Sequence, residues 1–323
     1  MLEHKKDGLK AFLLLLVPLI LLAIFTFFPL VKTIIIAFMP QYNANLDQFQ
    51  MSFDGGFHIF DSFVYLFRPG SDFMSALVNT LIIVFISVPA STIIALLIAV
   101  LLNSIKPLQK VFQTIFFLPY VTNVLALGMV FSVLFQWPGT TNYGQNGIIN
   151  TIFGLGNYNW LDAGADEWAW RSVVLIYTIW NGLAFKILVF IGGLQSISKQ
   201  YYDAAKIDSA SQARVLTKVT IPLLSPMISY ILITSFIGAF KSYEQILGLF
   251  GDMNTTNPTA FAQRNTLVGF TYSMVENPYD FSRFTEGRPQ MYSLGAAAAV
   301  LLFIIILCFT LFNNYLSRKR VHY

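Results

Sequence analysis

The stretch 201–222, YYDAAKIDSASQARVLTKVTIP, is a polar island in an apolar chain. Its charged residues are Asp203, Lys206, Asp208, Arg214 and Lys218. The segments on either side, LIYTIWNGLAFKILVFIGGL (175–194) and LLSPMISYILITSFIGAF (223–240), carry one charge between them, Lys186. Each flanking segment is long enough to cross a bilayer, for which roughly 20 apolar residues suffice. The island is therefore expected to lie at the membrane surface and to join two membrane helices.

The composition extends this interpretation to the whole chain. Of its 323 residues, 56% are hydrophobic and 11% are charged, and the charged share is about half of that in soluble domains. Backbone groups inside a bilayer must be hydrogen-bonded within the chain, and the apolar blocks do not alternate as barrel strands do. We expect an all-α integral membrane protein with six transmembrane helices and short cytoplasmic helices in the island. The blocks lie at about 11–38, 76–102, 111–135, 172–194, 221–240 and 292–316.

Prolines inside these blocks are interpreted as kinks in continuous helices, because membrane helices tolerate them. They are Pro18, Pro29, Pro89, Pro119 and Pro226. The first block follows HKKDGLK (4–10) but is too long for a cleaved signal peptide, so it is expected to be a retained helix.

Basic residues are distributed unevenly between the two sides of the membrane. With six helices, the side that holds both termini and the island has twelve Lys and Arg residues, and the opposite loops have four. The positive-inside rule places both termini in the cytoplasm. We predict a cytoplasmic tail at 1–10, a six-helix membrane domain at 11–317 with the island loop at 198–220, and a cytoplasmic tail at 318–323. The four basic residues of the opposite loops are Arg68, Arg264, Arg283 and Arg288, and the twelve are Lys5, Lys6, Lys10, Lys106, Lys110, Lys199, Lys206, Arg214, Lys218, Arg318, Lys319 and Arg320.

Signals for catalysis are missing from the sequence. It contains no GxxxxGK[ST] phosphate loop, no HExxH and no G-x-S-x-G, and its three histidines lie far apart. We therefore predict no catalytic residue, metal site or cofactor in this chain, which disfavours an integral-membrane enzyme. The membrane blocks contain no Asp or Glu, which disfavours a self-sufficient secondary transporter coupled to protons or sodium.

The island has two possible interpretations. Its basic residues suit an amphipathic loop lying on anionic headgroups. Alternatively, good helix formers begin at Ser198, a turn is expected near Ser209, helical spacing resumes after it, and Pro222 opens the next membrane helix. The second interpretation predicts two short helices at an angle, joined directly to the membrane helices.

The detailed pattern favours the second interpretation. The string D-A-A-x-x-D-S-A (203–210), with Pro222 placed 14 residues after Asp208, resembles the E-A-A-x-x-D-G-A…P loop of binding-protein-dependent ABC importer permeases. The flanking IWNGLAFKILVFIGGLQSI (179–197) and IPLLSPMISYILITSFIGAF (221–240) resemble the carbohydrate branch, which includes the maltose permease family. The resemblance covers roughly 76–318. It departs at Asp203, where Glu is usual, and at Ser209, where Gly is usual.

The resemblance implies a type I ABC importer permease fold, and it implies that the island is a coupling loop inserted into a cytoplasmic ATPase subunit. Two ATPase subunits would bind ATP and Mg, and a second homologous permease and an extracellular solute-binding protein would complete the importer in the plasma membrane. The residues that the resemblance assigns to ATPase coupling are Asp203, Ala204, Ala205, Ile207, Asp208, Ser209, Ala210 and Arg214.

The resemblance also places substrate between the two helices that flank the island. The implied contacts are Thr178, Trp180, Asn181, Gly182, Phe185, Ser235, Gly238, Ala239 and Ser242, and the alternative is that these residues only pack helices together. Lys186 lies within a membrane block, and Lys241 lies near the end of the next one. They are candidate anion contacts, although Lys241 can also pair with Glu244. The favoured substrate is a carbohydrate, preferably an oligosaccharide, and the alternative is an anionic solute such as glycerol phosphate or a uronate sugar.

Overall fold

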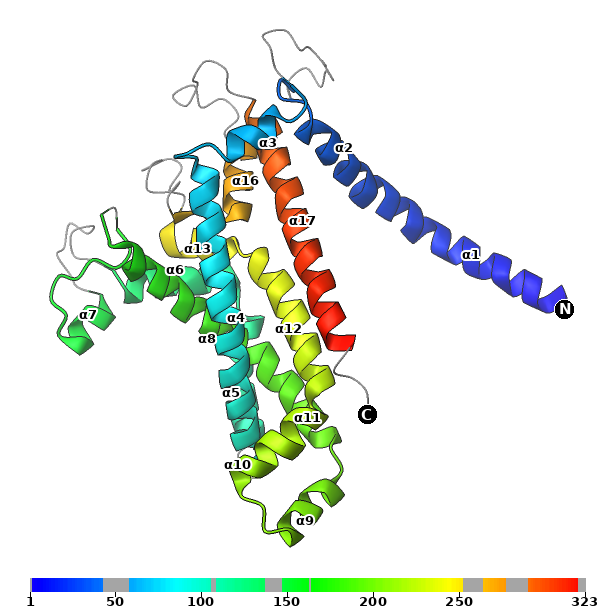
Figure 1. Ribbon diagram of the computed structural model, residues 1–323, viewed down its shortest axis with the longest axis vertical. Helices are drawn as coiled ribbons and strands as arrows, with labels where there is room; N and C mark the ends of the chain where they lie inside the picture. The colour runs from blue at the N-terminus through cyan, green and yellow to red at the C-terminus, as the bar shows by residue number, and fades with distance from the viewer. Residues whose placement is uncertain are drawn as a thin grey trace. The chain divides into compact units, whose positions relative to one another are not determined.

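The computed structural model describes residues 2–42, 58–105, 109–136, 147–162, 164–251, 264–276 and 290–318, and all regular secondary structure within them is helical (Figure 1). Basic residues Lys106, Arg283, Arg288, Lys319 and Arg320, and parts of the long loops, lie outside the described residues. The elements are α1 (Leu2–Leu22), the π-helical turn η1 (Ala23–Phe27), α2 (Phe28–Ala37), α3 (Asp61–Leu66), α4 (Asp72–Ser104), α5 (Gln109–Val121), α6 (Val124–Leu134), α7 (Ile148–Phe153), α8 (Glu167–Ser196), α9 (Lys199–Ile207), α10 (Gln212–Val215), the π-helical turn η3 (Leu216–Thr220), α11 (Ile221–Leu223), α12 (Ser225–Phe240), α13 (Glu244–Phe250), α16 (Leu267–Glu276) and α17 (Met291–Arg318).

Each predicted membrane block corresponds to a candidate membrane span. Four are single helical stretches: Phe12–Ala37, Asp72–Ser104, Glu167–Ser196 and Met291–Tyr315. The other two are bent helix pairs, and the described residues hold up to six spans when each pair counts as one. The prediction of an all-helical membrane protein is confirmed.

The two bent pairs correct the expectation that prolines only kink the helices. The pair α5 and α6 turns by 97°, and the segment Gln212–Leu223 turns by 69° against α12. At the first break, the side chain of Asn123 accepts hydrogen bonds from the backbone N–H groups of Leu125 and Ala126 and so starts a new helix. At the second, Pro226 lies in the first turn of α12 and has no N–H to continue the preceding helix. The helices α1 and α4 do continue through Pro18 and Pro89.

The chain divides into two units. One comprises residues 1–74 and 270–303. Within it, the most apolar window of Phe12–Ala37 is not buried at all, as expected of a helix whose side chains contact lipid. The Ser293 hydroxyl donates to the carbonyl of Met39, and the backbone N–H of Gln290 donates to the carbonyl of Pro40. These bonds tie the start of α17 to the segment after α2.

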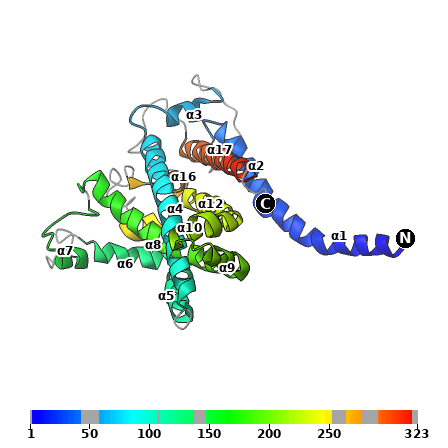
Figure 2. The ribbon, with the colours of Figure 1, turned by 60° about the horizontal axis from the view of Figure 1, so that its bottom comes forward.

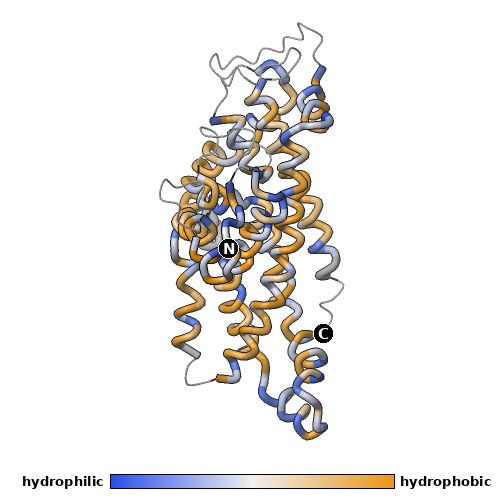
Figure 3. Tube along the Cα trace, turned by 90° about the vertical axis from the view of Figure 1, so that its left-hand side faces the viewer, coloured by the Kyte–Doolittle hydropathy of each residue, from blue (hydrophilic) through white to orange (hydrophobic). Residues whose placement is uncertain are grey.

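The other unit comprises residues 75–269 and 304–323 and is organised around α8. One apolar cluster includes the α8 residues from Trp170 to Tyr177, with Ile83 of α4 and Ile246 of α13. A second includes the α8 residues from Ile187 to Leu194, with α4 residues from Ala95 to Leu102. Both helices therefore contribute to both clusters. Hydrophobic positions predominate along the helices drawn in Figure 3. The stretch of each helix between the two clusters belongs to neither cluster.

Candidate functional site

A cavity of about 440 Å³ lies between the two apolar clusters of this unit. Its lining comes from the middle of α4, the end of α5, the middle of α8, the second half of α12 and the start of α13. The lining combines hydroxyl, amide and glycine positions with the aromatic rings of Tyr120 and Phe185, so that the cavity is more polar than the clusters on either side. The lining residues are Ser87, Val88, Ser91, Tyr120, Thr178, Asn181, Gly182, Phe185, Lys186, Thr234, Ser235, Gly238, Ala239 and Gln245.

Most of the residues predicted to contact substrate meet at this cavity. The lining includes the predicted Thr178, Asn181, Gly182, Phe185, Ser235, Gly238 and Ala239, together with Lys186. They come from α8 and α12, the two helices that flank the island, as the resemblance implied.

Three predicted residues do not line the cavity. The Trp180 ring packs on Phe131, with ring centroids 5.4 Å apart. The Ser242 hydroxyl donates to the carbonyl of Ala239 at the end of α12. Lys241 is exposed and forms no ion pair with Glu244 in this part of the structure. Substrate contacts by these three residues stay predictions that the cavity does not support.

The contribution of α4 and α5 to the cavity was not predicted from the sequence. Ser87 and Ser91 lie one helical turn apart on α4, and the Ser91 hydroxyl donates to the carbonyl of Ser87. The Tyr120 ring at the end of α5 stacks on Phe185 with a centroid distance of 5.7 Å and an interplanar angle of 22°. The i, i+4 serine spacing in an otherwise apolar helix was the available signal.

Lys186 is the one charged residue among those that line the cavity, and it is 5% exposed. Its Nζ donates to the Ser91 hydroxyl oxygen, which links α8 to α4. Gly182 lies one turn before Lys186 on the same face of α8, and an added Cβ there would lie 3.7 Å from both Lys186 Nζ and Ser91 Oγ. This glycine therefore keeps the centre of the cavity open.

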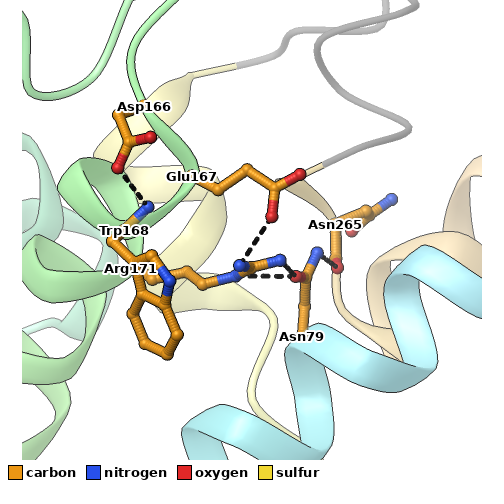
Figure 4. A network of polar contacts seen from close by, with 6 residues as sticks. All are labelled: Asn79, Asp166, Glu167, Trp168, Arg171 and Asn265. Atoms are coloured by element: carbon orange, nitrogen blue, oxygen red, sulfur yellow. Dashed lines mark hydrogen bonds and ion pairs between the residues drawn. The ribbon is translucent and has the colours of Figure 1, made fainter.

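A buried arginine, Arg171, connects neighbouring segments at the end of this unit where α8 begins (Figure 4). Arg171, near the start of α8, pairs with Glu167 at 2.7 Å and donates through Nε and Nη2 to Asn79 Oδ1 at 3.2 and 3.0 Å. Asn79 in turn donates to the carbonyl of Asn265 at 3.2 Å. The network connects α4, α8 and the segment before α16.

A second arginine, Arg264, fixes the loop that precedes α8. Its guanidinium donates to the carbonyls of Leu161 and Asp162. Burial lowers the pKa of Arg264, and the nearby charge of Asp162 opposes this shift. Both arginines therefore stabilise the structure around the cavity and do not line it.

The island forms two short helices beyond the end of α8 (Figure 1), and Figure 2 turns this end toward the viewer. Ser198 caps α9 by accepting from the backbone N–H of Gln200, and Ser211 caps α10 by accepting from that of Arg214. Tyr202 Oη lies 3.4 Å from Thr220 Oγ1, which joins α9 to the turn η3. The island is thus joined to α8 through the extended residues Ile197 and Ser198, and its other end continues through η3 and α11 toward α12.

Ser209 has a left-handed backbone conformation, with φ of +50°. The N–H of Ala210 donates to the carbonyl of Ala205, and the N–H of Ser209 donates to that of Lys206, each at 3.0 Å. This pair of bonds is the Schellman motif, which ends helices at a left-handed residue that is usually Gly. The geometry explains why Gly is usual at this position of the pattern and shows that Ser adopts the same turn.

The surface of the island is available for a partner. Ile207 is 83% exposed at the end of α9, although it is apolar. Asp203 and Lys206 form an exposed ion pair at 3.3 Å, and such pairs contribute little to stability. Of the residues assigned to coupling, Ala205 is buried, Ala210 is partly buried, and Asp203, Ala204, Ile207, Asp208, Ser209 and Arg214 are exposed.

Replacing Ser209 with Gly is expected to stabilise the island. The left-handed conformation costs a residue with a Cβ about 1–2 kcal/mol, and part of this gain is offset because Gly makes the unfolded chain more flexible. A net gain of about 0.5–1 kcal/mol should appear as slower hydrogen exchange at the amides of position 209 and of Ala210. Ser209→Val places a β-branched residue in the same conformation and should speed exchange, and equal exchange in both variants would contradict the strain argument.

The comparisons with known proteins agree with this architecture. Residues 87–322 match the family described as the binding-protein-dependent transport system inner membrane component. The chain is 30% identical to the probable ABC transporter permease protein MG188 of Mycoplasma genitalium, over 94% of this chain and 83% of that protein. It is 28% identical to the arabinooligosaccharides transport system permease protein AraP of Halalkalibacterium halodurans, over 93% of this chain and 87% of that protein.

A solved structure shares the fold. The crystal structure of a bacterial ABC transporter involved in the import of the acidic polysaccharide alginate superposes with a TM-score of 0.76 and 21% identity, covering 99% of this chain and 98% of that one. The fold and the matches define a multi-pass helical membrane protein of the ABC importer permease class. The chain belongs to the family of inner membrane components of binding-protein-dependent transport systems.

Proposed function

We propose that this chain is the permease subunit of an ATP-driven importer that moves an oligosaccharide, delivered by an extracellular solute-binding protein, into the cell. The observation that carries the substrate class is the cavity. It combines the stacked Tyr120 and Phe185 rings with hydroxyl and amide groups from Thr178, Asn181 and Ser235. Sugar rings pack their C–H faces on aromatic side chains, and their hydroxyls require polar partners.

The names of relatives point to the same class of substrate. Among the similar proteins are a multiple sugar-binding transport system permease of Streptococcus mutans and a lactose transport system permease of Rhizobium radiobacter. A second structure with this fold, with a TM-score of 0.73, 21% identity and coverage of 99% of this chain and 97% of that one, is a complex with a periplasmic protein bound to an alginate pentasaccharide. These relatives support a sugar importer without identifying the sugar.

In this proposal the energy comes from two ATPase subunits, which bind ATP and Mg, and the island is the surface on which one of them docks. The exposed Ile207 supplies an apolar anchor and Asp203 an acidic contact. Closure of the ATPase pair moves α9 and α10, and the helices α8 and α12 carry this movement to the cavity as a rigid-body tilt. A second, homologous permease completes the pathway, and both termini lie in the cytoplasm by the positive-inside rule.

Replacing Gly182 with Leu tests the cavity. The new side chain would extend past Lys186 and Ser91 into the open space, so that we expect oligosaccharide uptake by cells carrying the complete importer to fall by about tenfold or more, the equivalent of roughly 1.4 kcal/mol of substrate binding. Gly192 on the same helix has open space around its Cβ position, and Gly192→Leu is the matched control that should keep uptake. Normal uptake by a Gly182→Leu importer that assembles correctly would refute the proposed substrate site.

A further inference from the structure

Hydrogen-bond donors surround the Lys186 ammonium group on the wall of the cavity that α4 and α8 form. The Ser91 hydroxyl donates to the carbonyl of Ser87 at 2.5 Å, so its oxygen accepts the bond from Lys186 Nζ. An ammonium group has three N–H donors, and no other hydrogen bond joins Lys186 to the described residues. Two donors of a buried cation are therefore available to a ligand in the cavity.

Two further hydroxyls on this wall have no hydrogen-bond partner in the part of the chain that the structure describes. Ser87 Oγ and Thr178 Oγ1 are buried, line the same cavity as Lys186, and bond to none of the described residues. Buried hydroxyls are normally hydrogen-bonded, and an unsatisfied one is costly. Thr178, Gly182 and Lys186 follow one another at intervals of four residues on α8, so the free hydroxyl, the open space and the cation share one helix face.

The charge of the cavity is unbalanced. None of the residues that line it is acidic, and Lys186 forms none of the ion pairs of the described residues. A charged side chain within a membrane span is expensive and typically marks a site that binds or moves a ligand. An anionic ligand would supply the missing counter-charge and would accept hydrogen bonds from the free hydroxyls.

We propose that Lys186, Ser87 and Thr178 form a carboxylate subsite, and that the substrate is an acidic oligosaccharide with a uronate residue. This inference rests on the proposed function and narrows its substrate class. A carboxylate is a monoanion, and a single ammonium with two hydroxyls matches its charge and its two oxygens. A sugar phosphate carries close to two negative charges, and the lining offers no second cation and no arginine for it.

Sugar binding to the complete permease and ATPase complex in nanodiscs tests the subsite without selection by the binding protein. The probes are labelled trigalacturonate, its methyl ester, maltotriose and galactose phosphate, each with and without a non-hydrolysable ATP analogue. We expect trigalacturonate to bind at least about tenfold more tightly than its ester. Lys186→Met should abolish this preference, and Thr178→Val, which keeps the side-chain shape, should reduce it. Lys241→Met removes the same charge from an exposed position outside the cavity and should keep it.

Four other outcomes of this binding experiment would count against the carboxylate subsite or against the proposed function. Equal binding of trigalacturonate, its ester and maltotriose, unchanged in Lys186→Met, would overturn the carboxylate subsite and leave the carbohydrate function standing. Preferred binding of galactose phosphate would assign the subsite to phosphate instead. Loss of the preference in Lys241→Met but not in Lys186→Met would place the anion contact outside the cavity. No binding of any probe would count against the proposed function itself.

Discussion

Asp203→Lys is expected to abolish sugar uptake while leaving the permease inserted in the membrane. Asp203 is 64% exposed on α9, and its side chain pairs with Lys206 on the same helix. Charge reversal therefore changes the docking surface far more than the fold. Breaking a charge pair at an interface costs about 2–5 kcal/mol, which corresponds to a loss of roughly 30-fold or more in affinity for the ATPase subunit.

Co-purification of the ATPase subunit and uptake of labelled oligosaccharide measure this effect together. Asp203→Glu is the matched control, because it keeps the carboxylate and restores the residue that is usual in the pattern. It should retain both activities. Full ATPase binding and uptake by Asp203→Lys would show that α9 is not the docking surface and would favour the alternative in which the island lies on lipid headgroups.

Gly248→Ala is expected to destabilise the protein strongly, although it adds only one methyl group. An ideal Cβ at Gly248 would lie 2.5 Å from the Leu125 carbonyl oxygen and 2.9 Å from Gly128 Cα. Both obstacles are backbone atoms, so that α13 must move away from α6 and the cluster around Ile246 and Leu249 must repack. Overpacking that forces side chains off their rotamers and shifts the backbone costs about 1–3 kcal/mol, and occasionally more.

The measurement is the thermal unfolding midpoint of the detergent-solubilised protein together with the yield of monodisperse material. Gly192→Ala is the control, because Gly192 lies in α8 with nothing within 4 Å of its Cβ position. Ala is favoured over Gly within helices by about 1 kcal/mol, so this control should match or exceed the wild type. A Gly248→Ala protein as stable as the wild type would show that α6 and α13 do not cross as closely as described.

The sequence predicted the helices well because their signals are local. The apolar blocks are long and continuous, and the island carries caps at Ser198 and Ser211 and a turn at Ser209 within a few residues of one another. These features need no knowledge of distant parts of the chain. The substrate-contact residues were predicted from the resemblance, which implied a site between α8 and α12.

The features that could not be predicted depend on contacts between distant segments. Residues Ser87 and Lys186 are 99 positions apart, and the serine spacing on α4 does not by itself indicate which distant helix the serines face. The 97° turn between α5 and α6 occurs at the cap formed by Asn123, which is one of several polar residues in this block of the sequence. Gly128 and Gly248 look unremarkable until the close approach of their helices is known.

The most direct test of the central claim is the ATPase activity of the complete importer in proteoliposomes, measured with its solute-binding protein and oligosaccharide added separately and together. If this chain is the permease that couples the cavity to the ATPase subunits, hydrolysis should rise only when binding protein and sugar are both present. The rise should disappear in the Asp203→Lys complex. Hydrolysis that ignores binding protein and sugar in the wild-type complex, or a response that survives intact in Asp203→Lys, would contradict the account.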